Sequence, residues 1–395
     1  MRSHKFAAWL AIAVLLTAIG CQRPPKPSPI VKPATPSRTI AAQAEENRAR
    51  QFPELRPAAA ADDQVARNLA EGKQPYSHLM GYQPQPQQSE RFLRSLPQPT
   101  LRQANPQLFR PRGPPPANEY AADQPVLLYR ALNAAHLRKF GEPWKAHRQE
   151  IGDCVSHGWA LACEIALALD YVQGTGGDFE IVATEPLYGL SRVEGRNLSY
   201  NRSGDGSYGA AAAAGVTKFG LPFRLDYRSV ASSESDLRIY SGSRARNWGA
   251  WGCGGKDDRG RLDTIAKLHA VRQVALVETW EETKAAIVNG YAIAVCSGQG
   301  FAYATDADGF ARASGSWPHC MCAVGIRFDR EGVLIANSWG DFIDQTSGKF
   351  PTDMPKGCFW CDRRTWEGMT RGRDTYAVST VVGFPPRKLS LVEGL

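Results

Sequence analysis

Apolar residues follow two different spacings in the region after residue 122. In its first half they recur every three or four positions, which is the spacing of helices that bury one face. This spacing predicts helices over residues 126–140, 155–173 and 208–219, the last ending at Gly220. The stretch 155–173 is so rich in apolar residues that we expect a buried helix there.

The second half consists mainly of short β-branched and aromatic runs separated by Gly, Asp and Pro, which are typical of strands. We expect strands over residues 291–296, 320–328, 333–337, 357–362 and 376–382, and one more helix over 280–289. Helices followed by strands predict an α+β fold, in which a helical half and an antiparallel β half face each other across a cleft.

The chain begins with a different pattern, a basic start followed by a short apolar run from Phe6 to Ile19. This run is too short to cross a bilayer comfortably, and it predicts a secretory signal peptide over residues 1–20. The small residues before Cys21 resemble the bacterial lipobox, in which the Cys is acylated at cleavage. We expect lipid on Cys21 to hold the protein at the periplasmic or extracellular face of a bacterial membrane. The alternative is an ordinary signal peptide followed by a chance Cys.

Residues 21–122 contain about two-thirds of the chain's 27 prolines, many Gln and Ala, and few aromatic residues. This composition buries too little apolar surface to offset the entropy of ordering, and it predicts a disordered tether. The net charge of +8 belongs to the first 122 residues, since residues 123–395 hold 31 basic and 31 acidic residues. We therefore expect one folded domain over 123–395, without the basic surface that nucleic-acid binding needs.

Three residues of the folded region, Cys154, His319 and Asn337, occur in the order that thiol catalysis requires. Cys154 lies where the buried helix is expected to begin, so the helix dipole and unpaired backbone N–H groups would favour a thiolate. His319 stands at the head of one expected strand and Asn337 at the end of the next, where its side chain can fix the tautomer of the imidazole. We expect Trp339 to cover that hydrogen bond and keep water away.

The stretches around these residues resemble the papain family of cysteine peptidases. His319–Gly325 matches the family's His-Ala-x-Ala-x-Val-Gly strand, and Asn337–Gly340 reproduces its Asn-Ser-Trp-Gly. The resemblance implies that Gly204, Asp205 and Gly206 belong to the substrate-binding loop, where glycine lets a substrate backbone approach closely. It also implies hydrolysis of peptide or protein substrates through an acyl-thioester, without a cofactor.

The nucleophile region departs from the family pattern and permits two registers. In one, His157 takes the nucleophile's position, and the protein is a catalytically silent module that binds peptide or cell-wall material. In the other, Ile151–Cys154 aligns with the Leu-Gly-Ser-Cys of divergent bacterial relatives, so that Cys154 is the nucleophile and Gln149 the oxyanion donor. The second register supplies both a Cys and a Gln and is the one we adopt, although Arg148 stands at the six-residue position where the family has its Gln.

Each of these residues alone is more often structural, and only their ordered combination supports the hypothesis. A related thiol acyl-transfer enzyme acting on cell-wall peptides would share Cys then His, but it would not be expected to carry Asn-Ser-Trp-Gly. The remaining cysteines leave disulfide pairing open. Four of them have a spacing that a zinc site can use, but strand cysteines more often fill a core, so we expect no metal: Cys320, Cys322, Cys358 and Cys361.

Overall fold

The computed structural model describes residues 59–109, 124–195, 204–256 and 261–379, together with residues 384 and 389. The predicted signal peptide, Cys21 and residues 22–58 and 110–122 of the predicted tether lie outside these residues. Within the described part of the chain, no helix combines the length and the apolar character that crossing a membrane requires.

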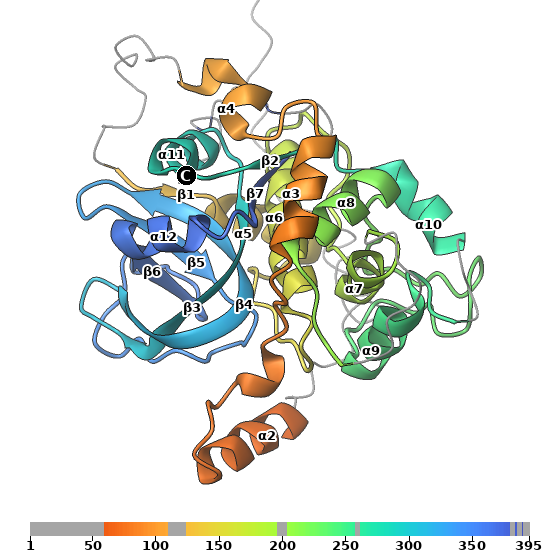
Figure 1. Cartoon of the computed structure of the whole chain (residues 1–395), viewed down its shortest axis with the longest axis horizontal. Coiled ribbons are helices and arrows are strands. Elements are labelled where there is room, and N and C mark those ends of the chain that lie inside the picture. The colour runs from red at the N-terminus through yellow and green to blue at the C-terminus, as the bar shows by residue number, and fades with distance from the viewer. Residues whose placement is uncertain are drawn as a thin grey trace, which may run out of the picture. The chain divides into compact units, whose positions relative to one another are not determined.

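The four helices predicted from the sequence are present. They are α5 (Tyr129–Phe140), α6 (Cys154–Val172), α8 (Gly209–Phe219) and α11 (Trp280–Val288). The structure adds α7 (Thr184–Arg192), α9 (Gly242–Trp251), α10 (Arg261–Ala266), the 3₁₀ turn η3 (Lys267–His269) and α12 (Arg363–Thr370). Helix α6 is buried along almost its whole length because strands of the sheet and the helices α5, α7 and α8 pack against it (Figure 1).

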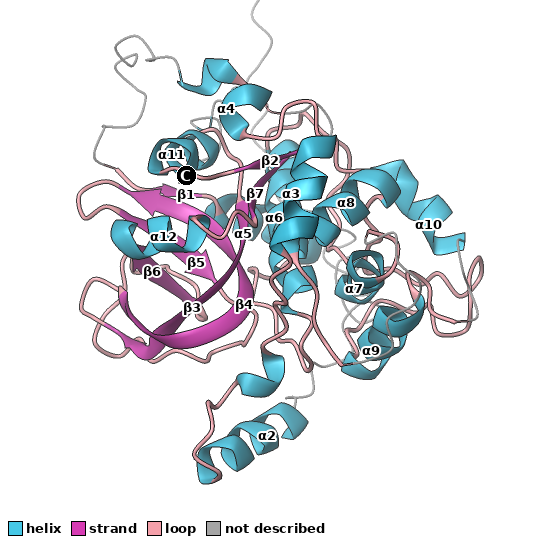
Figure 2. Ribbon diagram, viewed as in Figure 1, coloured by secondary structure: helices cyan, strands magenta, loops and turns pink. Residues whose placement is uncertain are grey.

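The strands form one antiparallel sheet, which confirms the predicted α+β fold (Figure 2). Its order is β2 (Gln273–Leu276), β7 (Thr375–Ser379), β3 (Ile293–Thr305), β4 (Ala311–Arg327), β5 (Gly332–Ala336) and β6 (Cys358–Asp362), with β1 (Val126–Leu127) paired to β4. Strands β3 and β4 are longer than predicted, because their hairpin continues through a Gly-rich stretch with shifts of register. His319 therefore lies inside β4 and not at its head.

The start of α6 packs closely against β4. Gly158 has no side chain at the contact point, and a Cβ there would lie 3.0 Å from Sγ of Cys320 and 3.0 Å from the carbonyl oxygen of Met321. Because Cys154 and Gly158 are four residues apart, they lie on the same face of the helix. The fold thus brings the helix start that carries Cys154 against the strand that carries His319.

Residues 59–109 require a correction to the predicted tether. They form α2 (Ala59–Ala70), η1 (Ser77–Leu79), α3 (Pro86–Ser95), α4 (Leu101–Ala104) and η2 (Pro106–Phe109). Leu79, Leu93 and Leu101 are buried, and Thr100 forms a β-bridge with Leu276 of β2. The average composition of residues 21–122 concealed these few apolar positions, which dock the segment on the domain.

Candidate active site

His319 and Asn337 meet as the sequence predicted, because β4 and β5 are neighbours in the sheet. Nε2 of His319 lies 2.6 Å from Oδ1 of Asn337, an acceptor, so this nitrogen carries the proton and donates it. The Trp339 ring covers the pair, with its centroid 4.4 Å from that of the imidazole. Both partners are buried, at 0% exposure for His319 and 2% for Asn337.

Cys154 is the first residue of α6, and its thiol is fully buried. The backbones of Gly81 and of Cys320, the residue after His319, lie within hydrogen-bonding range of the sulfur. Burial raises the pKa of Cys154 well above its ordinary value, and these two backbone groups lower it by less. The thiol is therefore protonated in this form.

The second nitrogen of His319, Nδ1, is buried and has no hydrogen-bond partner among the described residues. Burial is the main cause that lowers the pKa of His319 to about 3; the hydrogen bond to Asn337 opposes this, and His157 adds to it. The imidazole is thus neutral near pH 7, with Nδ1 as an unused acceptor. A thiolate–imidazolium pair is absent from this form of the site.

Gln149 lies at the site with its amide held in one orientation. Its Oε1 accepts a hydrogen bond from Oγ of Ser338 at 2.5 Å, and its Nε2 donates to the carbonyl oxygens of Leu79 and Ile151, both at 2.7 Å. An amide N–H aimed at a peptide carbonyl has the orientation of an oxyanion donor. The role of Gln149 as oxyanion donor stays a prediction, and the contact with Ser338 that holds its amide was not predicted.

Residues 76–83, called here the covering segment, run across this site and were not predicted to do so. The backbone N–H of Tyr82 donates to the carbonyl of Pro318 at 3.0 Å, next to His319. Ser207 donates to Gly81 and accepts from Gln83, both at 2.8 Å, so the segment pairs with it as a parallel strand. After the 3₁₀ turn η1, residues 80–83 of the covering segment occupy the site as an extended peptide.

Gly81 is the point of closest approach between the covering segment and the start of α6. A Cβ on Gly81 would lie 1.7 Å from the carbonyl oxygen of Gly152, two residues before Cys154. No side chain fits there without moving one of the two backbones. Only a glycine can sit at this position, which is the one sequence signal that could have pointed to the segment.

The loop predicted to bind substrate lies beside the covering segment. Gly204 and Gly206 both have positive φ, 62° and 113°. The carbonyl of Asp205 accepts from Nε2 of Gln83 at 2.7 Å, while its carboxylate pairs with Arg246 at 3.1 Å. An extended chain does bind at this loop, but the backbone pairing is made by the next residue, Ser207.

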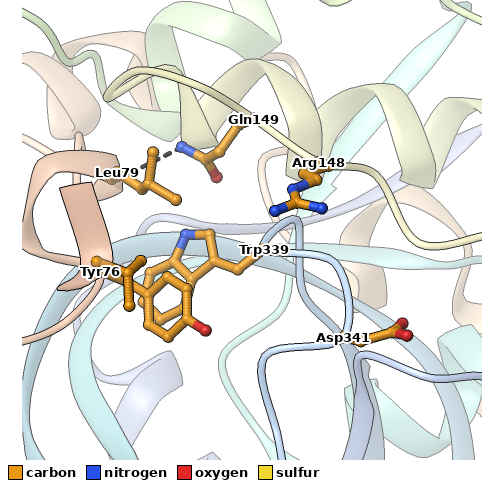
Figure 3. Close-up of a pocket in the computed structure, with 7 residues that line it drawn as sticks. Tyr76, Leu79, Arg148, Gln149, Trp339 and Asp341 are labelled. Atoms are coloured by element: carbon orange, nitrogen blue, oxygen red, sulfur yellow. Dashed lines mark hydrogen bonds between the residues drawn. The ribbon is translucent and has the colours of Figure 1, made fainter. Parts of the chain in front are cut away.

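A pocket of about 170 Å³ lies beside Trp339 (Figure 3). Its lining combines α2, the covering segment and the two sides of the site: Val65, Tyr76, Leu79, Arg148, Gln149, Trp339 and Asp341. The ring of Tyr76 stacks on that of Trp339, with centroids 4.9 Å apart and an interplanar angle of 10°. Arg148 and Gln149 were the two residues near the expected oxyanion position. Arg148 forms a backbone bridge with Trp339, whereas Gln149 donates its side-chain amide to the carbonyl of Leu79.

His157, the alternative occupant of the nucleophile position, points into the helical half. Its Nδ1 lies 3.4 Å from Nδ1 of His147, its Nε2 lies 3.4 Å from the Asp153 carboxylate, and its ring contacts that of Tyr240. Burial, followed by the neighbouring His147, holds the pKa of His157 well below its usual range. This side chain therefore belongs to a cluster in the helical half.

The described residues contain no group of three or more His, Cys, Asp or Glu side chains placed to hold a metal ion. The four strand cysteines that have a possible zinc spacing are buried free thiols: Cys320, Cys322, Cys358 and Cys361. They fill the core of the sheet.

Several solved structures share this arrangement of elements, and all are papain-like cysteine proteases. Xylellain from Xylella fastidiosa has 14% identity and a TM-score of 0.43, with 68% of this chain and 91% of that one covered. A procathepsin B from Trypanosoma congolense has 9% identity, a TM-score of 0.44, and coverage of 88% and 99%. The ragweed allergen Amb a 11 in its proform has 13% identity, a TM-score of 0.42, and coverage of 87% and 94%.

No protein-family model and no curated protein sequence matches this chain. At the identities and TM-scores above, the likeness concerns the fold and says nothing of this chain's activity. These solved structures are cysteine proteases, and it is the papain family of cysteine peptidases that the sequence motifs of this chain resemble.

Proposed function

We propose that this chain is a cysteine peptidase that hydrolyses peptide bonds in proteins or peptides, with Cys154 as nucleophile, His319 as its base and Asn337 as the residue that orients the base. The observation that supports this most directly is the hydrogen bond from Nε2 of Gln149 to the carbonyl of Leu79. In this proposal the carbonyl of Leu79 stands in for the oxygen of a substrate.

In this proposal the covering segment keeps the site closed. While it is in place, Cys154 and His319 are both buried and uncharged, because ionising them would cost the desolvation of two charges. When the segment leaves, water and substrate reach the site, and proton transfer from Cys154 to Nδ1 of His319 gives the reactive thiolate. Gln149 and the N–H of Cys154 then stabilise the oxyanion, an effect worth about 10²–10³-fold per donor.

The test is active-site labelling of the full chain with an epoxysuccinyl inhibitor, read by peptide mass spectrometry. We expect the label on Cys154, slowly in the wild type and faster in Gly81→Ala, whose Cβ cannot fit against Gly152. Gly177→Ala is the matched control, because a Cβ there meets nothing within 4 Å. Cys154→Ala must lose the label.

Absence of label from a folded Gly81→Ala chain would instead support the silent peptide- or cell-wall-binding module. Circular dichroism of the same samples distinguishes a folded, unreactive chain from a misfolded one. Peptide turnover by the labelled and unlabelled samples then relates the thiol to hydrolysis.

We also propose that Cys21 carries lipid and that the protein is held at a bacterial membrane outside the cytoplasm. The support is the sequence pattern of residues 1–21 alone. Metabolic incorporation of a fatty-acid analogue should label the wild type and spare Cys21→Ala. Equal labelling of both chains would rule out acylation at this residue.

A further inference from the structure

Two buried cysteines face each other in the sheet next to the proposed base. Cys296 of β3 and Cys320 of β4 are direct cross-strand partners, and the next pair along is Ser297 with His319. The sulfur atoms of the two cysteines lie 2.7 Å apart. Two thiols with no bond between them would normally be further apart than this, so the site is already close to the geometry of a disulfide.

The backbone geometry of this pair favours a bond. The N–H of Cys296 donates to the carbonyl of Asp374 at 3.2 Å, on the side of β7, so it points away from β4. Cys296 and Cys320 are therefore a non-hydrogen-bonded pair of the antiparallel ladder, the kind in which opposing Cα atoms are about 4.5 Å apart and side chains are closest. Disulfides form at Cα separations of about 4.4–6.8 Å, so only a small shift is needed.

We propose that Cys296 and Cys320 form a disulfide when the chain folds in an oxidising environment. The oxidant is a low-molecular-weight disulfide such as oxidised glutathione. One protein thiolate attacks it, which gives a mixed disulfide and releases one glutathione. The second protein thiolate then displaces the other glutathione, so two protein thiols become one disulfide and one oxidised glutathione becomes two reduced ones.

The bond forms before the site closes. Both sulfurs are fully buried in the folded chain. The phenol of Tyr82 lies beside both of them, so the covering segment also separates them from solvent. An oxidant added to the folded, reduced chain would reach them slowly.

The disulfide also concerns the proposed nucleophile, a consequence that rests on the proposed function although the disulfide itself does not. Cys320 is the cysteine whose backbone and side chain lie beside the thiol of Cys154. Pairing Cys320 with Cys296 removes the neighbour with which Cys154 could be oxidised. Among the described residues, Cys154 then keeps its thiol while the cysteine beside it no longer has one.

Cys322 provides a matched control, because it lies two residues further along the same strand. Its partners across the sheet are Ala294 on β3 and Ala336 on β5, so no cysteine stands opposite it. Replacing Cys322 by Ser should leave the proposed bond intact. Replacing Cys296 by Ser should abolish it.

The experiment is oxidative refolding of the full chain in a glutathione buffer, followed by alkylation of free thiols and tryptic mapping without reduction. Cleavage at Arg312 separates Cys296 from Cys320, so we expect one linked pair of peptides in the wild type, in Cys322→Ser and in Cys154→Ala. Persistence of the link in Cys154→Ala makes this result independent of peptidase activity. Cys320 and Cys322 share the tryptic peptide 313–327, so fragmentation of the linked pair, which shows which of the two cysteines is alkylated, decides the question in the wild type if a variant fails to fold.

Either of two results overturns the proposal. The first is alkylation of both Cys296 and Cys320 in the refolded wild type. The second is a link from Cys320 to Cys154 or to any cysteine other than Cys296.

Discussion

His319 in the sheet and His157 in the helical half are alike in residue type and burial, but they differ in what their nitrogens meet. His319 has one nitrogen on Asn337 and the other buried without a hydrogen-bond partner among the described residues. His157 lies against a second imidazole, that of His147, on one side and the Asp153 carboxylate on the other. Nε2 of His157 also lacks a hydrogen bond, but it lies 3.4 Å from the Asp153 carboxylate. Of the two residues, it is His319 whose Nε2 donates to an Asn side chain, as expected of an oriented base.

The difference shows why sequence order alone left the register open. Cys154 and His157 are three residues apart on α6, and either can be aligned with the nucleophile of the family. Their contacts differ: Cys154 shares its face with Gly158, which packs on β4, whereas the imidazole nitrogens of His157 lie near His147 and Asp153. These contacts favour the register with Cys154 as nucleophile, which stays a prediction.

The largest expected effect is on the rate at which Cys154 is labelled, and it should differ between His319 and His157. In the Gly81→Ala background, His319→Ala should slow labelling of Cys154 by about 10²–10⁴-fold, the usual contribution of a positioned base. His157→Gln should change the rate per folded molecule by only a few-fold, because its imidazole nitrogens lie near His147 and Asp153 and its effect on His319 is the smallest of those that shift that pKa. Labelling rates normalised to the folded fraction check this. Equal losses in both variants would contradict the assignment of His319 as the base.

His319 and His157 should have the same kind of effect on how the stability of the fold depends on pH. The unfolded chain binds a proton at His319 below its ordinary pKa of 6.5, whereas the folded chain does so only near 3. The stabilising contribution of the neutral imidazole is therefore complete above pH 6.5 and is lost as the pH falls, by up to about 1.4 kcal/mol per pH unit.

The free energy of unfolding of the wild type, taken relative to that of His319→Gln, should thus be about 2–3 kcal/mol higher at pH 6.5 than at pH 4.5. Urea unfolding at several pH values measures this difference, in which the other titrating groups cancel. His157→Gln should show the same sign, because burial lowers its pKa too. A pH-independent difference for His319→Gln would mean that the folded site takes up a proton as readily as the unfolded chain.

The parts of the site that were predictable lie in short stretches of sequence. Asn337, Ser338 and Trp339 are consecutive, and their motif fixed both the partner of His319 and the ring that covers it. The covering segment was missed because its contacts join residues far apart in the chain, such as Gly81 with Ser207. Most of these contacts are made by backbone groups, which every residue carries, so their pattern leaves little trace in the sequence.

A smaller effect tests the orienting residue. Asn337→Ala removes the acceptor from Nε2 of His319 and leaves a buried donor unpaired, at a cost of about 1–3 kcal/mol. In the Gly81→Ala background we expect labelling of Cys154 to slow by a corresponding factor of about 5–150, with the greater part recovered by Asn337→Asp. The control is Asn289→Ala, which removes another buried amide, one that donates to the carbonyl of Ala285. A loss equal to that in the control would assign Asn337 a structural role only.

The smallest effect concerns the stack of Tyr76 on Trp339, through which the covering segment holds the sheet side of the site. Tyr76→Leu should weaken the binding of the covering segment to the site by about 0.5–1.5 kcal/mol. Labelling of Cys154 in the otherwise wild-type chain should then become about 2–12-fold faster. Tyr171→Leu, which alters a tyrosine packed on Phe179, should leave the rate unchanged. In the Gly81→Ala background the gain from Tyr76→Leu should disappear, because the segment is already displaced. A gain of the same size in both backgrounds would mean that Tyr76 acts on Trp339 and the His319 ring beneath it, and not by holding the segment in place.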